Sequence, residues 1–308
     1  MQLKYHFFSA IIFLLSKIPF WFYHLVAYLL GRFFYYTGLY RGKVVKHNLD
    51  IAFAQKTEKG RNSIRKKFYL HLADLLIESL KAYSLSDKSI KKRYKFIPNE
   101  AVQKLADEKK NIAVVLPHFN NWEWAPRGLN FMLERHNPLM LIMYKTLKDP
   151  VADSVARRTR GGNYDQVIMF PKDDLMKVMQ KYHEQHYAVG FAADQSPANA
   201  YSCHWMNFLG LETGVFFGLE KFAKKQQLAV VYYHVKKVKR SFYEVEMEVI
   251  SSNATEEPHT FITEQHMKLL EVDILENPQY WLWTHKRWKR KKPADFDEKR
   301  NAFKTKSK

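Results

Sequence analysis

The sequence predicts an α/β fold: a central, largely parallel β-sheet flanked by helices, with an N-terminal membrane-anchoring helical segment. Two observations carry this prediction. Short apolar runs alternate with helical patterns after residue 111, and an apolar stretch follows the N-terminus. A chain of 308 residues is long enough for one catalytic-sized α/β core with an additional helical segment.

The chain divides into four expected segments. Residues 1–40 form the N-terminal membrane anchor, and residues 41–110 form a helical segment that packs on the catalytic domain. The catalytic domain spans residues 111–292. Residues 293–308 form a basic C-terminal tail that we expect to fray after Pro293.

The first segment contains the stretch "FFSAIIFLLSKIPFWFYHLVAYLLG", from Phe7 to Gly31, which Pro19 interrupts. It is long enough to span a bilayer with a kink, or to lie in the interface as two short helices around the proline. A cleavable signal peptide is disfavoured because no small-residue cleavage site follows. A buried helix of a soluble core is the alternative. The basic residues after the stretch place the remaining chain in the cytoplasm; they are Arg32, Arg41, Lys43 and Lys46.

Five apolar runs predict buried strands, and helical patterns separate several of them. The runs are "NIAVVLP", "PLMLIMY", "QVIMFP", "YAVGFAA" and "LAVVYYH". Helices are expected at residues 173–185 and 214–226, and the pattern of "RNSIRKKFYLHLADLLIESLKAY" predicts an earlier amphipathic helix. Continuously hydrophobic strands between helices favour a parallel sheet that is covered on both faces.

The charge of the chain limits the classes of partner. Fifty Lys and Arg residues against 31 Asp and Glu residues give a formal net charge of +19, which suits nucleic acid, an anionic membrane surface or an acidic partner. A nucleic-acid-binding protein is disfavoured because no reader motif is present and the apolar N-terminus would have no role. The single cysteine, Cys203, permits no internal disulfide and no cysteine-rich metal site, and nothing around it indicates an activated thiolate.

The stretch "VVLPHFNNWEWAPRG" supplies the candidate catalytic pair. His118 directly follows a predicted strand, where α/β proteins bind their ligands. Residues five apart on a helix are separated by about 140°, so His118 and Glu123 can meet only if the intervening residues form a turn or an irregular helical turn. Asn120 and Asn121 permit such a turn. A carboxylate on one ring nitrogen would leave the other nitrogen free as a base; the alternative is a polar turn that caps a helix.

Several blocks in order support a family resemblance over nearly the whole chain. They are "GKVVKHNLDIAF", "HFNNWEW", "VARRTRGGNYDQVIMFPKDDL", "VGFAADQSP" and "NPQYWLWTHKRWK". With these blocks the sequence resembles the lauroyl/myristoyl acyltransferase family of lipid A biosynthesis in Gram-negative bacteria. That family is part of the lysophospholipid acyltransferase superfamily, which has a His-x4-Asp/Glu signature. Two departures are that Asn120 stands where the family has glycine, and that the block around Thr213 and Gly214 keeps little else of a threonine-rich segment.

The resemblance implies a mechanism and a set of partners. His118 would deprotonate an acceptor hydroxyl, which attacks the thioester of an acyl carrier protein, while Glu123 holds the imidazole and balances its charge. A thioester is already activated, so the reaction requires neither a metal nor a cofactor. The implied partners are acyl carrier protein, a lipid A precursor and inner-membrane lipids, with no nucleic acid. The implied location is the inner membrane, with the catalytic domain on its cytoplasmic face.

Five further residues are candidate substrate-binding groups. Arg158 and Arg160 lie in the arginine-rich block, where a guanidinium suits a headgroup phosphate; the sequence does not choose between them, and solvated helix-end charge is the alternative. Asp194 and Gln195 end a predicted strand at the same sheet edge as His118, and could orient an arginine or the acceptor, or simply form a turn. Asn121 completes this set.

Two other functions remain open from the sequence. The enzyme could acylate another lipid, such as a lysophospholipid, an aminolipid or a glycolipid. Alternatively, the protein could be a non-catalytic scaffold at a membrane surface. The basic run "HKRWKRKK" fits a contact with a membrane surface or lipid phosphates, and its alternative interpretation is a solvated tail.

Overall fold

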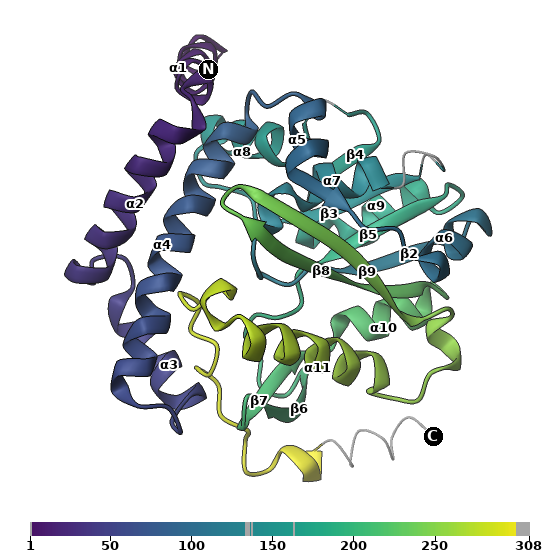
Figure 1. Ribbon diagram of the computed structural model, residues 1–308. Helices are drawn as coiled ribbons and strands as arrows, with labels where there is room; N and C mark the ends of the chain where they lie inside the picture. Colours follow the sequence, from purple (N-terminus) through teal and green to yellow (C-terminus); the bar gives the residue numbers. More distant parts are fainter. Residues whose placement is uncertain (1, 133–135, 137, 163, 300–308) are drawn as a thin grey trace.

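The computed structural model describes residues 2–132, 136, 138–162 and 164–299. At its centre is a seven-stranded sheet with the strand order β1-β9-β8-β2-β5-β3-β4 (Figure 1). The strands are β1 (Tyr94–Phe96), β2 (Ile112–Val115), β3 (Leu139–Tyr144), β4 (Val167–Pro171), β5 (Tyr187–Phe191), β8 (Ala229–Lys239) and β9 (Phe242–Ser251). A separate antiparallel pair consists of β6 (Cys203–Phe208) and β7 (Leu211–Phe216).

The prediction of a largely parallel sheet is confirmed. Within the seven-stranded sheet every neighbouring pair is parallel except β8 with β9. The five apolar runs correspond to β2, β3, β4, β5 and β8. The short β1 comes from the segment expected to be helical, and it joins the sheet beside β9.

Helices cover both faces of the sheet and also its carboxyl edge. They are α1 (Gln2–Lys17), α2 (Phe20–Thr37), α3 (Gly42–Ala52), α4 (Glu58–Ala82), α5 (Asp87–Arg93), α6 (Glu100–Asp107), α7 (Ala125–Met132), α8 (Pro150–Gly161), α9 (Leu175–Tyr182), α10 (Gly218–Lys225) and α11 (Phe261–Glu276). The predicted helix at 173–185 is therefore α9 with a 3-10 turn before it. The predicted helix at 214–226 begins later, because residues up to Phe216 belong to β7.

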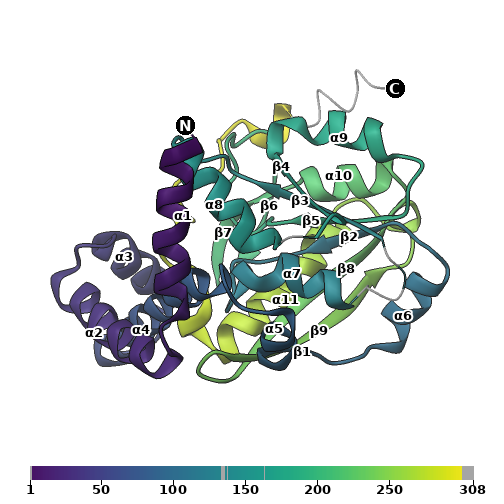
Figure 2. The ribbon, with the colours of Figure 1, turned by 90° about the horizontal axis from the view of Figure 1, so that it is seen from above.

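Two hydrophobic cores lie on the two faces of the sheet. Alternate residues of β2 point to opposite sides, so Ala113 and Val115 join one core while Ile112 and Val114 join the other. The first core packs against helices α3, α4, α9, α10 and α11, and the second packs against α5, α6 and α7. Figure 2 shows α9 and α10 on one side of the strands and α5 and α7 on the other.

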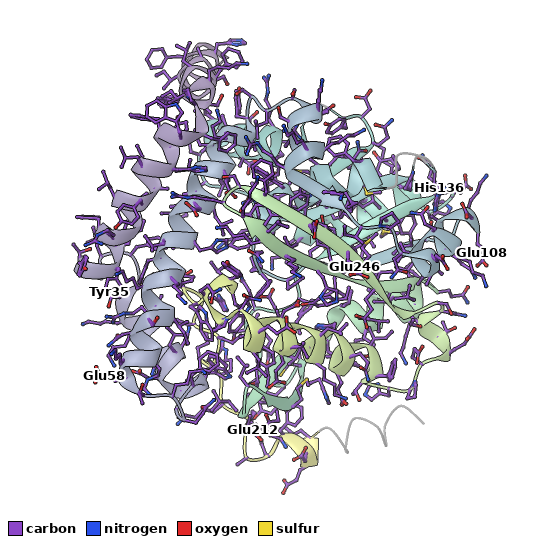
Figure 3. The ribbon with its side chains drawn as sticks, viewed as in Figure 1. Tyr35, Glu58, Glu108, His136, Glu212 and Glu246 are labelled. Atoms are coloured by element: carbon purple, nitrogen blue, oxygen red, sulfur yellow. The ribbon has the colours of Figure 1, made fainter. Side chains whose placement is uncertain are left out.

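The N-terminal helices form a layer against α4. Helices α2 and α4 run side by side, with Tyr23 and Ala27 of α2 buried against Ala73 and Ile77 of α4 (Figure 1). Gly31 permits this approach, since a Cβ there would lie 2.8 Å from the backbone of α4. Figure 3 labels Tyr35 of α2, whose ring lies 4.9 Å from the Arg65 guanidinium of α4. The N-terminal layer is thus packed on the folded domain.

No helix in the described part of the chain is by itself long and apolar enough to cross a bilayer. Residues His6–Lys17 and Phe20–Thr37 reach that length and composition only as a pair, and the pair is bent by 102°. The bend lies at Pro19, as the sequence predicted. Lys81 of α4 fixes it, because its ammonium group donates hydrogen bonds to the carbonyl groups of Ser16 and Ile18.

The prediction that the tail frays after Pro293 is wrong for the residues that follow directly. Phe296 is buried, and its ring packs against Tyr201 and Trp205 at centroid distances of 6.4 and 6.3 Å. The buried ring, together with a hydrogen bond from the Tyr201 hydroxyl to Asp295, holds this turn on the β6–β7 side of the protein. Residues 300–308 of the predicted tail lie outside the described residues.

Candidate active site

The site lies at the carboxyl ends of two adjacent parallel strands. Strand β2 pairs with β5 so that Val115 stands opposite Phe191, and each strand is followed three residues later by a polar side chain. These side chains are His118 and Asp194, whose Nδ1 and Oδ1 atoms lie 2.7 Å apart. The sheet therefore brings together two residues that are 76 positions apart in the sequence.

Asp194 is a buried carboxylate that accepts hydrogen bonds from two neighbouring side chains. Its second oxygen accepts a hydrogen bond from the indole Nε1 of Trp281 at 2.9 Å. Burial alone would raise the pKa of Asp194, but the charge of His118 and the hydrogen bonds from His118 and Trp281 lower it to about 2. An ionised carboxylate can only accept, so the His118 proton sits on Nδ1.

This tautomer leaves Nε2 of His118 as the proton acceptor. Burial lowers the pKa of His118, but the Asp194 carboxylate, its hydrogen bond and the nearby Glu123 charge outweigh burial, so the net shift is upward. The Gln195 amide nitrogen lies 3.2 Å from His118 Nε2 and can donate a hydrogen bond to the lone pair of that ring nitrogen. With its side chain 19% exposed, His118 is accessible to a substrate. The geometry is that of a general base with an orienting carboxylate.

The expected pairing of His118 with Glu123 is not what the structure contains. Glu123 instead forms a bidentate ion pair with Arg160, with Nε–Oε2 and Nη2–Oε1 distances of 2.5 and 2.9 Å. The reason is local: Glu123 lies in a 3-10 turn, Trp122–Trp124, that leads into α7 and directs the carboxylate towards α8. Glu123 still raises the pKa of His118 through its charge. The orienting partner of His118 is Asp194.

The predicted substrate-binding residues Asn121, Arg158 and Arg160 have different partners in the structure. Asn121 is buried; its Oδ1 accepts from the Trp124 amide and its Nδ2 donates to Glu78 of α4, so it fixes the turn. Arg160 faces Glu123, whereas the Arg158 guanidinium lies over the Tyr83 ring at 4.8 Å. The two arginines are about 200° apart around α8, so one phosphate is poorly placed to engage both.

The loop after His118 is held by the C-terminal part of the chain. Asn120 has φ of +53°, donates its backbone N–H to the Tyr280 carbonyl at 2.9 Å, and donates from its side chain to the Val235 carbonyl. The His118 carbonyl accepts from the Leu282 amide at 3.1 Å. Asparagine is among the few side chains that tolerate the left-handed region, which explains how it can stand where the resembled family has glycine.

Two residues of the block "NPQYWLWTHKRWK" belong to the site but were not among the predicted site residues. Trp281 anchors Asp194, and His285 accepts a hydrogen bond from the Ser196 amide at 3.0 Å. The pKa of His285 is lowered to about 4, first by burial and then by neighbouring positive charges, so this ring is neutral. The block was visible in the sequence, but its contact with the strand ends was not.

The basic run that follows was expected at the surface, and for Arg287 that expectation is wrong. Its guanidinium is buried and donates to the Gly214 carbonyl at 2.8 Å. The neighbouring Trp288 donates from its indole nitrogen to the Thr213 hydroxyl. Thr213 and Gly214, the residues kept from the threonine-rich segment, thus serve as anchors for this part of the chain.

Comparison with known proteins identifies the family. Residues 2–290 match the family described as bacterial lipid A biosynthesis acyltransferase. The chain belongs to this family. It is also 24% identical over 187 residues to a protein of Haemophilus influenzae named lipid A biosynthesis acyltransferase. That match covers 60% of this chain and 56% of the relative's length. The expectation of the family is confirmed.

The site of this lipid A biosynthesis acyltransferase family member is built from a histidine, a carboxylate and an amide. Among the residues that the structure describes, no group of three or more His, Cys, Asp or Glu side chains is arranged to hold a metal ion. The polar groups gathered at the strand ends are His118, Asp194 and Gln195, with the Glu123–Arg160 pair beside them.

Proposed function

We propose that the protein transfers a fatty acyl chain from an acyl carrier protein thioester to a hydroxyl group of a lipid A precursor. The observation that carries this proposal is the His118–Asp194 pair at the carboxyl edge of the sheet, in a chain that belongs to the lipid A acyltransferase family. A base with a fixed tautomer suits the activation of a hydroxyl group.

The reaction follows from the hydrogen bonds around His118. The acceptor hydroxyl takes the place of the Gln195 amide at Nε2 and gives its proton to that nitrogen. The resulting oxygen nucleophile attacks the thioester carbonyl, and the tetrahedral intermediate collapses with cleavage of the C–S bond. The proton on Nε2 then passes to the departing thiolate. Asp194 remains ionised and stabilises the imidazolium during the step.

The Glu123–Arg160 pair has a supporting role in this proposal. Its carboxylate contributes negative potential at the imidazolium, and its guanidinium keeps the carboxylate in place without adding a net charge. We assign no phosphate to Arg160, because Glu123 occupies two of its donor positions.

The positive charge of the chain supports an acidic donor. Acyl carrier proteins are strongly acidic, and the protein carries a formal net charge of +19. Lys289 and Lys291 are exposed on the segment that directly follows His285 and Arg287. A carrier protein bound there would bring its thioester close to the strand ends that hold His118.

We place the N-terminal helices on the cytoplasmic face of the inner membrane. An apolar stripe on α2 faces away from the domain: Trp21, Leu25 and Leu29 repeat every four residues and are 70%, 52% and 59% exposed. Aromatic and apolar side chains of this kind suit the interface between headgroups and acyl chains. The bent α1–α2 pair would lie in that interface with its apolar side towards the acyl chains.

Replacing Trp21, Leu25 and Leu29 together by glutamine should move the protein from vesicles into solution, because it removes apolar area without touching the α2–α4 contact. The measurement is co-sedimentation with vesicles, alongside the melting temperature. The control replaces Val272 and Leu275 of α11 by glutamine. These two side chains are exposed to a similar degree, at 53% and 55%, and their replacement should leave vesicle binding unchanged. Equal vesicle binding by the stripe variant and the wild type would contradict the interfacial position.

The proposed reaction is tested by lipid mass spectrometry of a strain that lacks the gene. We expect lipid A lighter by one acyl chain, restored by the wild-type protein and not by a variant without the His118 base. An altered phospholipid or aminolipid with unchanged lipid A would show that the acceptor is that lipid and not a lipid A precursor. If no lipid changes in the deletion strain, the result would favour a non-catalytic membrane scaffold over an acyltransferase.

A further inference from the structure

A polar cavity lies outside the His118 site. It has a volume of about 220 Å³ and is bordered by the end of α4, by α7 and by the end of α8. Its polar lining includes Tyr83, Asp87, Arg127, Arg158 and Tyr164. A water molecule occupies about 30 Å³ in the liquid, so the cavity admits a group several times larger.

Arg127 forms the inner wall of this cavity. Its guanidinium is buried and donates to the carbonyl groups of Ala82 and Leu85 at 2.9 and 3.0 Å, and to Asp87 at 3.0 Å. Its Nε is buried and has no partner among the described residues. Gly162 lies against this nitrogen: its φ is +69°, and a Cβ there would be 3.3 Å from Nε. A larger residue at position 162 would crowd this nitrogen, and would approach the Tyr164 ring still more closely, at 2.6 Å from the added Cβ.

Arg158 forms the outer wall and has an unneutralised charge. Its guanidinium stacks on Tyr83 at 4.8 Å and makes no side-chain hydrogen bond or ion pair with any residue that the structure describes. The other arginines of α8 differ, since Arg157 pairs with Asp153 and Arg160 pairs with Glu123. Stacking on an aromatic face holds the guanidinium plane while leaving its N–H groups available for an anion.

The charges around the cavity favour an anion. Two guanidinium groups face one carboxylate, Asp87, which also accepts a hydrogen bond from Tyr164. Arg127 is therefore neutralised, and Arg158 supplies the excess positive charge. Forked guanidinium donors match phosphate oxygens, and such charge-assisted hydrogen bonds are roughly twice as strong as neutral ones.

The position of the cavity relates it to a lipid surface. Helix α1 contacts both α4 and α8, the helices whose ends border the cavity, and Figure 2 shows α1 beside α8. Phe7 and Leu14 of α1 are 62% and 67% exposed. If these side chains enter the interface, the cavity lies near the level of the headgroups, where phosphate groups are concentrated.

We infer that this cavity binds a phosphate monoester between Arg158 and Arg127, separately from the His118 centre. The inference assigns Arg158 and Arg160 different roles: Arg158 binds the anion, and Arg160 holds Glu123. It does not depend on acyl transfer, because binding of the phosphate can be measured without turnover. The phosphate can come from a lipid headgroup or from free phosphate, and the experiment separates the two sources.

The test compares Arg158→Gln with Arg157→Gln in the full-length protein. Arg157 is the matched control because it is the adjacent arginine of α8 but does not line the cavity. Binding of inorganic phosphate is measured by ³¹P NMR titration at constant ionic strength. We expect saturable binding by the wild type and by Arg157→Gln, and at least about tenfold weaker binding by Arg158→Gln. Each substitution removes one partly exposed contact, the Tyr83 stack of Arg158 or the Asp153 ion pair of Arg157, so the two melting temperatures should differ little.

A second arm uses phosphatidylcholine vesicles with and without phosphatidic acid, whose headgroup is a phosphate monoester. If phosphatidic acid increases vesicle binding through Arg158 and inorganic phosphate competes with it, the ligand is a headgroup. If only inorganic phosphate binds, the same site serves free phosphate. The inference is overturned if wild-type phosphate binding does not saturate, or if Arg158→Gln and Arg157→Gln bind phosphate equally. Neither result bears on whether acyl transfer occurs.

Discussion

Replacement of His118 by alanine is expected to abolish acyl transfer while the protein keeps its fold and its affinity for vesicles. Nε2 is the only atom in the described site with both a fixed lone pair and a neighbouring carboxylate to stabilise the proton it receives. A positioned general base contributes about 10²- to 10⁴-fold to a rate, so the expected loss lies in that range or beyond it. The measurement is turnover of an acyl carrier protein thioester by the purified enzyme.

Alanine also leaves the Asp194 carboxylate without one of its two donors, so a second variant is needed. In His118→Asn the amide nitrogen can donate to Asp194 as Nδ1 does, but the side chain has no basic atom. This variant should keep the melting temperature of the wild type and lose the activity. Substantial turnover by His118→Asn would show that the imidazole is not the base.

The strands could be predicted because most of them are continuously hydrophobic. Strand β2 is buried along its full length, and its run of apolar residues distinguishes it from the polar residues around it. Strand β9 was missed because it alternates, with Glu244, Glu246 and Glu248 separated by buried residues. That alternation indicates an antiparallel strand with one face in solvent, so the signal was present in the sequence.

The partner of His118 could not be predicted in the same way. A carboxylate five positions away is the obvious candidate in the sequence, and a 3-10 turn directs it elsewhere. Asp194 was correctly expected at the same sheet edge, but its role depends on the strand order. Because β5 lies directly beside β2, the two strand ends come within hydrogen-bond distance, and the order of strands in a sheet is not written in the order of the chain.

Asp194→Asn should reduce turnover by about 10⁴-fold, as the loss of an orienting aspartate does in a triad. Asp194 accepts from both His118 Nδ1 and Trp281 Nε1. An asparagine has one acceptor oxygen, so its NH₂ group must face one of these two donors. If it faces the ring, the His118 proton moves to Nε2 and the base is lost. If it faces the indole, the Trp281 anchor is lost.

Glu123→Gln is the matched comparison. Its turnover should fall by only roughly ten- to a hundredfold, because the glutamine amide oxygen can still accept one of the two hydrogen bonds from Arg160. The pH profile distinguishes orientation from mere support of the fold. In the proposed reaction the neutral imidazole is the active form, and Asp194 raises the pKa of His118, so wild-type activity should fall as the pH drops through that raised pKa. Asp194→Asn should shift the residual profile to lower pH, because the largest stabilising charge is gone. Equal profiles, or a greater loss in Glu123→Gln, would return the orienting role to Glu123.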